Sequence, residues 1–129
     1  MGQNDFFESF NRKYPAITQE QEKLNSIVEE ISDYWTQIYR QLLNTKHDVF
    51  INMRNSFEFS AWTSFTIDNR TLKAERVDNK VEIFLEVSGV KQPDVYSVYL
   101  ESDKPIFSKT KSDFTVNDLD FLLENLLDS

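Results

Sequence analysis

Side chains alternate along residues 56–68, where every second position faces the same side of an extended chain. One side is polar except at Trp62, which interrupts it with a large indole. The two-residue period predicts a long antiparallel strand over 56–67, buried on one side and exposed on the other. The side expected in the core carries Phe57, Phe59, Ala61, Thr63, Phe65 and Ile67.

The same period continues to residue 110 and predicts a sheet of five to six strands. Tight hairpin turns are expected at 68–69 and 78–79, which are both Asp-Asn, because these residues tolerate positive φ. Longer connections are expected around 89–93 and 103–105, which contain Gly and Pro. Short links between successive strands predict an antiparallel meander. The expected strands are 48–53, 56–67, 71–77, 80–88, 94–102 and 106–110.

Before the sheet, apolar residues recur at intervals of three and four, which predicts one long amphipathic helix. Thr18 and Gln21 have the spacing of a capping box at its start. The apolar stripe would suit either packing on the sheet or the seam of a coiled-coil dimer. Its mixture of Trp with β-branched residues favours the sheet. The stripe consists of Leu24, Val28, Ile31, Trp35, Ile38 and Leu42, widened by Ile27 and Tyr34.

Shorter helices are expected at the two ends of the chain. The first begins at Asn4 or Asp5 and extends through about Lys13, because Tyr14, the residue before Pro15, avoids the helical region. Its apolar side carries Phe6, Phe7 and Phe10. The last begins at Thr115 as its cap and is expected to dock through Leu119, Leu122, Leu123 and Leu126.

These elements predict an α+β fold in which an antiparallel meander sheet packs against the long helix. At 129 residues the chain has the length of one domain. The expected division is a helical part over 1–47, a sheet over 48–111 and a C-terminal helix over 112–129.

Composition narrows the classes of function. The chain is 14% aromatic and carries a net charge of -8 without a basic stripe, so we expect no nucleic-acid binding. It has no stretch of ~20 apolar residues and no signal-peptide pattern, so we expect a cytoplasmic protein that does not bind membranes. The absence of Cys excludes disulfides and Cys-ligated metals.

Few residues offer catalytic chemistry. His47 is the only histidine, and the two glycines form no phosphate-binding loop, so we expect no cofactor, no metal and no enzyme. The remaining catalytic hypothesis is a carboxylate enzyme that uses Glu58, Glu82 and Glu86, which share the polar side of the sheet.

The predicted binding residues are aromatic side chains on otherwise polar strand faces. Trp62 and Phe84 interrupt the polar sides of their strands, and Tyr99 falls on the same side if Tyr96 faces the core. Aromatic residues surrounded by charge resemble the anchors and rim of a protein interface. Alternatively, a terminal helix covers them, or they are cross-strand pairs that only stabilise the sheet. The predicted site comprises Trp62, Phe84, Tyr99, Glu58, Glu82 and Glu86.

The sequence therefore favours a small acidic protein-interaction module, such as an inhibitor or an immunity-type protein of bacterial or phage-like composition. It would act by covering a surface of a partner protein, and a basic protein is one such partner. A nucleic-acid mimic is a special case of the same hypothesis. The alternative is a carrier of small apolar ligands, with a cavity between the long helix and the sheet that is lined by Trp35, Phe57, Phe59, Phe65 and their neighbours. The sequence does not determine the oligomeric state.

Overall fold

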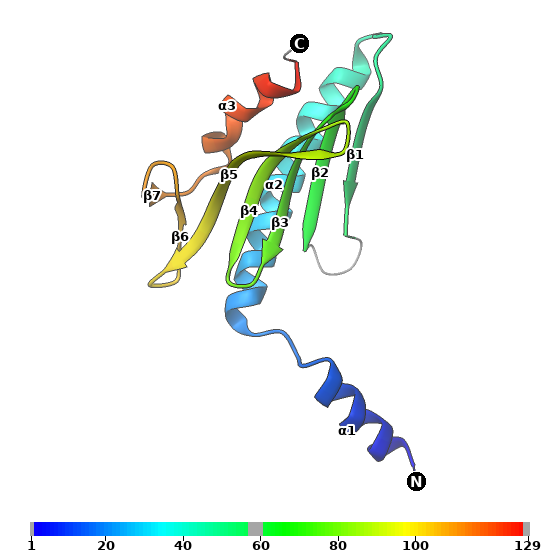
Figure 1. The fold of residues 1–129 in the computed structure, drawn as a ribbon, viewed down its shortest axis with the longest axis vertical. Coiled ribbons are helices and arrows are strands. Elements are labelled where there is room, and N and C mark those ends of the chain that lie inside the picture. The colour runs from blue at the N-terminus through cyan, green and yellow to red at the C-terminus, as the bar shows by residue number, and fades with distance from the viewer. Residues whose placement is uncertain (1, 57–60, 128–129) are drawn as a thin grey trace.

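The computed structural model describes residues 2–56 and 61–127. These residues form two N-terminal helices, a seven-stranded antiparallel sheet and a C-terminal helical segment (Figure 1). Helix α1 spans Gln3–Lys13 and α2 spans Gln19–Asn44. The predicted α+β class is confirmed, with one strand more than the largest expected number. No helix in the described ranges is long and apolar enough to cross a membrane.

The strands lie in space in the order in which they occur along the chain, so the sheet is the predicted meander. Asp68 and Asp78 have φ values of 60° and 56°, which confirms tight turns at both Asp-Asn pairs. The strands are β1 (Ile51–Asn55), β2 (Trp62–Ile67), β3 (Arg70–Val77), β4 (Lys80–Val87), β5 (Val90–Glu101), β6 (Lys104–Phe107) and β7 (Ser112–Asp113).

The strand expected over 56–67 is shorter than predicted, because β2 begins at Trp62. Before it, the Ser56 Oγ accepts a hydrogen bond of 3.1 Å from the Trp62 N–H. A polar side chain that bonds nearby backbone in this way competes with strand pairing. Phe57 and Phe59, both predicted to be buried, lie outside the described residues.

Strand β5 begins earlier than the predicted residue 94, because the turn at 88–89 is also tight. Phe84 pairs with Val95 and Glu86 pairs with Lys91, so residues 92–94 form a bulge opposite the single residue between them. Pro93 lies in this bulge, where its missing N–H costs no ladder hydrogen bond. The Gly and Pro residues that predicted a longer connection therefore mark a tight turn and a bulge within β5 instead.

The C-terminal segment is less regular than the predicted helix. After β7 it forms a 3-10 turn (Val116–Leu119), the single α turn α3 (Asp120–Leu123) and another 3-10 turn (Glu124–Leu126). The predicted cap is present, because the Thr115 N–H donates to Asp118 Oδ2 at 2.9 Å. Of the predicted docking residues, Leu123 is only partly buried; the fully buried ones are Leu119, Leu122 and Leu126.

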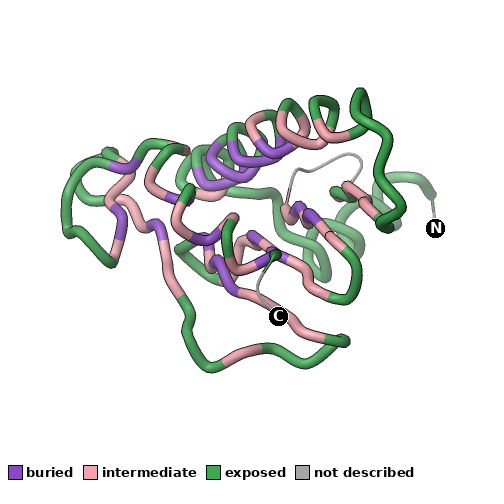
Figure 2. The backbone as a smooth tube through the Cα atoms, turned by 90° about the horizontal axis from the view of Figure 1, so that it is seen from above, coloured by how far each residue is buried: buried purple, intermediate pink, exposed green. Residues whose placement is uncertain are grey.

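Helix α2 lies across one face of the sheet and supplies one side of the core. Its Thr18–Gln21 capping box is formed, with hydrogen bonds of 3.0 and 3.1 Å. Figure 2 shows the buried residues on the side of α2 that faces the strands. The predicted stripe is thus confirmed as a sheet-packing surface. Its buried members are Leu24, Ile27, Val28, Ile31 and Trp35, and beneath them lie Phe65, Leu72, Ala74, Val81, Ile83, Val98 and Phe107.

Candidate protein-binding surfaces

In the described chain, the side of the sheet turned away from α2 is covered by no helix. In Figure 1, α2 runs behind the sheet. The C-terminal segment packs on the same side as α2, where the Tyr34 hydroxyl donates to Asp120 Oδ1 at 2.6 Å. We call the uncovered side the open face. Its residues alternate with those of the core and include Arg54, Trp62, Lys73, Glu75, Lys80, Glu82, Phe84, Glu86, Lys91, Val95, Tyr99 and Ile106.

Trp62 lies on the open face at the first position of β2 and is partly buried. It pairs directly with Glu75 across the strands. The Lys73 ammonium lies 5.7 Å from the centre of the indole and 3.7 Å from Glu75 Oε2. The indole is thus held beside one cation and one carboxylate, and part of its surface remains available for contact.

Phe84 also lies on the open face, but only 4% of its surface is exposed. Lys91 covers the ring with its ammonium 4.3 Å from the ring centre, and Lys73 and Val95 flank it on the neighbouring strands. The bulge in β5 places Lys91 there. No sequence period marks such a cover, so the burial of Phe84 was not foreseen. A partner would touch Lys91 and Val95 before it reached this ring.

Tyr99 is partly buried on the open face, where it pairs with Lys80 on one side and Ile106 on the other. Val95, on the same strand and the same side, is 42% exposed. Tyr99 therefore belongs to a mixed apolar and charged surface, as its sequence pattern predicts.

The predicted carboxylates do not assemble into one described group. Glu58 lies outside the described residues. Glu82 and Glu86 both lie on the open face, but four residues apart on one strand means ~13 Å. Among the described residues there is no group of three His, Cys, Asp or Glu side chains that could hold a metal ion.

The charges of the open face are balanced, although the whole chain carries -8. The acidic residues that outnumber the basic ones lie elsewhere, on the outer side of α2 and in the C-terminal segment. The open face itself is therefore suited to a partner with mixed charges. Its described bases are Arg54, Lys73, Lys80, Lys91 and Lys104, and its described acids are Glu75, Glu82, Glu86, Glu101 and Asp113.

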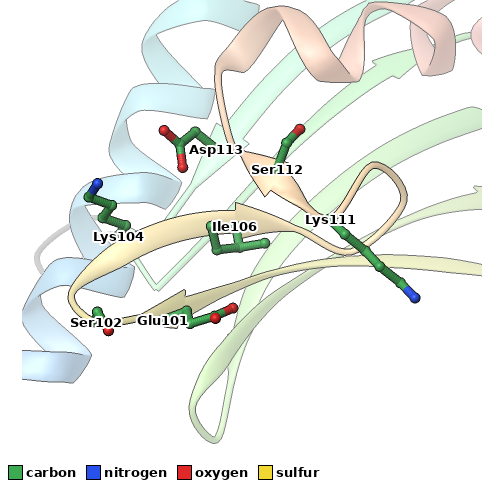
Figure 3. Close-up of a pocket in the computed structure, with 7 residues that line it drawn as sticks. All are labelled: Glu101, Ser102, Lys104, Ile106, Lys111, Ser112 and Asp113. Carbon is green, nitrogen blue, oxygen red and sulfur yellow. The ribbon is translucent and has the colours of Figure 1, made fainter.

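A shallow hollow of about 710 Å³ lies at the β5–β6–β7 edge of the sheet. Figure 3 shows that the charged side chains around it do not converge: Lys111 points away from Glu101 and Asp113. Without a convergent set of polar groups, the hollow has no arrangement typical of a catalytic or ligand site. Its lining is Glu101, Ser102, Lys104, Ile106, Lys111, Ser112 and Asp113.

Helix α1 presents a second uncovered apolar surface. None of its residues is buried, and Figure 1 shows it projecting beyond the end of the sheet. We call Phe6, Phe7, Phe10 and Tyr14 the aromatic face; they are 63%, 52%, 48% and 54% exposed. Neighbouring rings in this row contact each other in T-shaped or tilted arrangements, with centroids 5.0–6.1 Å apart. The sequence shows that this helix has an apolar side but not that this side is left uncovered. The one sequence feature that could have indicated it is Pro15, in the connector between α1 and α2.

A second hollow, of about 430 Å³, lies at the opposite end of the molecule, beside the β2–β3 turn. We call it the end hollow. Leu126 in its wall belongs to the core, whereas Leu127 is 72% exposed and Val49 is 48% exposed. Arg70 fixes the wall by donating a hydrogen bond of 3.0 Å to the Asn125 carbonyl. The lining consists of Val49, Ile67, Asp68, Asn69, Arg70, Leu126 and Leu127.

Comparison with known proteins gives no relative for these surfaces: no family model, no curated protein and no solved structure matches the chain.

Proposed function

We propose that this chain is a non-catalytic protein-interaction module that acts by covering a surface of another protein with its open face. The observation that carries the proposal is that every packed helical element of the described chain lies on the other side of the sheet. The open face is left with two partly buried aromatic residues, Trp62 and Tyr99, among alternating charges. Aromatic anchors with a charged rim are typical of protein interfaces.

Charge should contribute to recognition of the partner both at long range and at contact. The net charge of -8 favours the approach of a basic protein from a distance, and this approach weakens with added salt. At contact, the balanced charges of the open face favour a surface that carries both signs. An inhibitor or immunity-type role agrees with this division between steering and contact.

The ligand-carrier alternative gains no support from the described core. Trp35 and Phe65, expected to line a cavity between helix and sheet, are 0% and 1% exposed and pack within one cluster of side chains. Because both side chains are closely packed between helix and sheet, they have a structural role in the core.

Affinity purification from the native host with the tagged full chain tests the proposal. We expect a stoichiometric protein to co-purify with the wild-type chain and to be lost with Trp62→Ala. Phe10→Ala is the matched control, because it removes an exposed aromatic ring from a different surface. Equal recovery with both variants would contradict a partner site on the open face.

A further inference from the structure

The aromatic face of α1 is apolar, and four of the seven residues that line the end hollow are apolar. Helix α1 and the C-terminal segment, whose Leu126 and Leu127 line the hollow, lie toward opposite ends of the molecule (Figure 1). We propose that the aromatic face of one copy docks into the end hollow of a second copy, so that two copies pair reciprocally. The occupant of the hollow is thus a defined segment of the same protein. This pairing uses neither Trp62 nor Tyr99 and is independent of the proposed function.

Chain length excludes docking within one molecule. The connector between α1 and α2 covers residues 14–18 and spans ~20 Å at full stretch, and Phe6 lies only ~11 Å further along α1, so the aromatic face reaches at most ~31 Å. The 26 residues of α2 extend ~39 Å from this connector toward the other end of the molecule, where the C-terminus and the end hollow lie. The aromatic face therefore cannot reach the hollow of its own chain. A second copy in antiparallel orientation brings the two together.

The chemistry of the two surfaces matches. Exposed Phe rings on a helix are suited to an apolar groove in which they extend an existing core. The end hollow is such a groove, because its walls combine the exposed Val49 and Leu127 with the core residue Leu126.

The charges of these two surfaces do not oppose their contact. Helix α1 carries two acids and two bases, and the lining of the end hollow carries one of each, Asp68 and Arg70. Both are therefore neutral parts of a strongly acidic chain. The bases of α1, Arg12 and Lys13, lie in its last turn, and they can face the exposed carboxylate of Asp68 in the lining of the hollow.

The area favours reciprocal docking over simple pairing of two α1 helices. Four half-exposed aromatic rings offer roughly 400 Å² of contact area per helix. Two α1 helices against each other would bury roughly 800 Å² in total, the size of a weak crystal contact. Two helices, each covered by an end hollow together with its exposed rim residues Val49 and Leu127, would bury roughly 1,600 Å², which is standard for a specific complex. The reciprocal pair also closes on itself with two-fold symmetry.

Sedimentation of the full chain tests the pairing. From about 1 to 100 µM we expect the mass to rise from 15.3 kDa toward the dimer, and Phe6→Ser with Phe10→Ser should raise the dimer dissociation constant at least about tenfold. The matched control, Asn4→Ser with Asn11→Ser, changes two exposed polar residues of α1 outside the aromatic face at unchanged net charge and should have a much smaller effect. A wild-type chain that stays at 15.3 kDa throughout would overturn the proposal.

Cross-linking identifies the docking site, because the natural chain contains no Cys. A Phe7→Cys chain mixed with a differently tagged Val49→Cys chain should form the mixed disulfide at least about tenfold faster than the same chain mixed with Glu29→Cys. Glu29 is an exposed control on α2. Mixing single variants detects only contacts between molecules. Equal rates with both mixtures, or preferential Phe7→Cys self-linking, would overturn docking into the end hollow.

Failure of this pairing can be told from failure of the proposed function. Trp62→Ala should leave the dimer unchanged and remove the heterologous partner. Phe6→Ser with Phe10→Ser should remove the dimer and leave partner capture intact. Loss of dimer with Trp62→Ala, in a variant with unchanged circular dichroism melting, would overturn the assignment of pairing to α1 and the end hollow.

Discussion

Trp35 illustrates how a single side chain can be held by packing alone. It is fully buried in the centre of α2, and its Nε1 has no hydrogen-bond partner among the described residues. Its contribution to stability therefore comes from the contacts of the ring with the sheet.

Substitution of Trp35 separates packing from polarity. Trp35→Ala should lower the free energy of unfolding by about 3–5 kcal/mol, because it leaves a large cavity. Trp35→Phe should cost much less, because it keeps a ring and loses no hydrogen bond. Urea denaturation measures both. Equal losses would show that the indole N–H has a bonding partner.

The Tyr34 hydroxyl makes the stability of the fold depend on pH in alkaline solution. Its hydrogen bond to Asp120, with burial and the negative charge of Asp120 as smaller causes, raises the pKa of Tyr34 above the ordinary value of 10.0. Because the pKa is higher in the folded state, the stabilisation is fully present below pH 10.0 and is lost as pH rises through the folded pKa.

Tyr34→Phe should therefore lower stability at neutral pH by about 0.5–1 kcal/mol, a small loss because the bond lies near solvent. The wild-type protein should approach the stability of the variant in alkaline solution. Melting temperatures of both proteins between pH 7 and pH 11 provide the measurement. Parallel curves across this range would exclude the hydrogen bond as a stabilising contact.

At the scale of elements, the C-terminal segment covers one side of the core. Phe114 and Phe121 lie against Phe107 of β6, with ring centroids 5.9 and 6.5 Å apart. The segment is also tied to α2 by the Tyr34–Asp120 hydrogen bond.

Removing residues 114–129 should uncover Phe107 and the neighbouring core. We expect a lower melting temperature together with dye binding or aggregation, since the exposed surface is apolar. A truncated chain that stays monomeric and melts like the wild type would show that the segment is a detachable tail.

The sequence predicts a helix or strand well where one hydrophobic period dominates. It predicts a turn well where residues that tolerate an uncommon backbone conformation occur. Helix α2 has an unbroken apolar stripe and a capping box, and the Asp-Asn turns accept positive φ. Pro93 indicated an interruption but not its nature, because a bulge and a loop use the same residues. The strand predicted over 56–67 is too long at its start, because the alternating period does not reveal the hydrogen bond of the Ser56 side chain to the Trp62 N–H, where β2 begins.

The candidate site was predictable only in part. Strand alternation placed Trp62, Phe84 and Tyr99 on one face, because side-chain direction follows from period alone. The burial of Phe84 depends on Lys91 and a bulge, which are tertiary features. Whether an amphipathic helix packs on its own chain is also a tertiary question, so the aromatic face of α1 could not be recognised as unpartnered.

At the scale of the whole molecule, the distribution of charge gives two opposite salt dependences. Two copies at -8 repel each other, so added salt should strengthen self-pairing from low to physiological ionic strength. Binding of a basic partner should weaken over the same range. Sedimentation and partner titration at several salt concentrations test both. A self-pairing that weakens with salt would contradict contact through the neutral surfaces.

The most direct test of the open face as a partner surface is a binding titration of Trp62→Ala against the purified partner, beside its circular dichroism melt. We predict a melt close to that of the wild type, because the indole is only partly buried outside the core. We also predict a loss of roughly 2 kcal/mol or more in binding free energy, the scale of a tryptophan hot spot. A variant that unfolds, or that binds the partner as tightly as the wild type, would contradict this role of the open face.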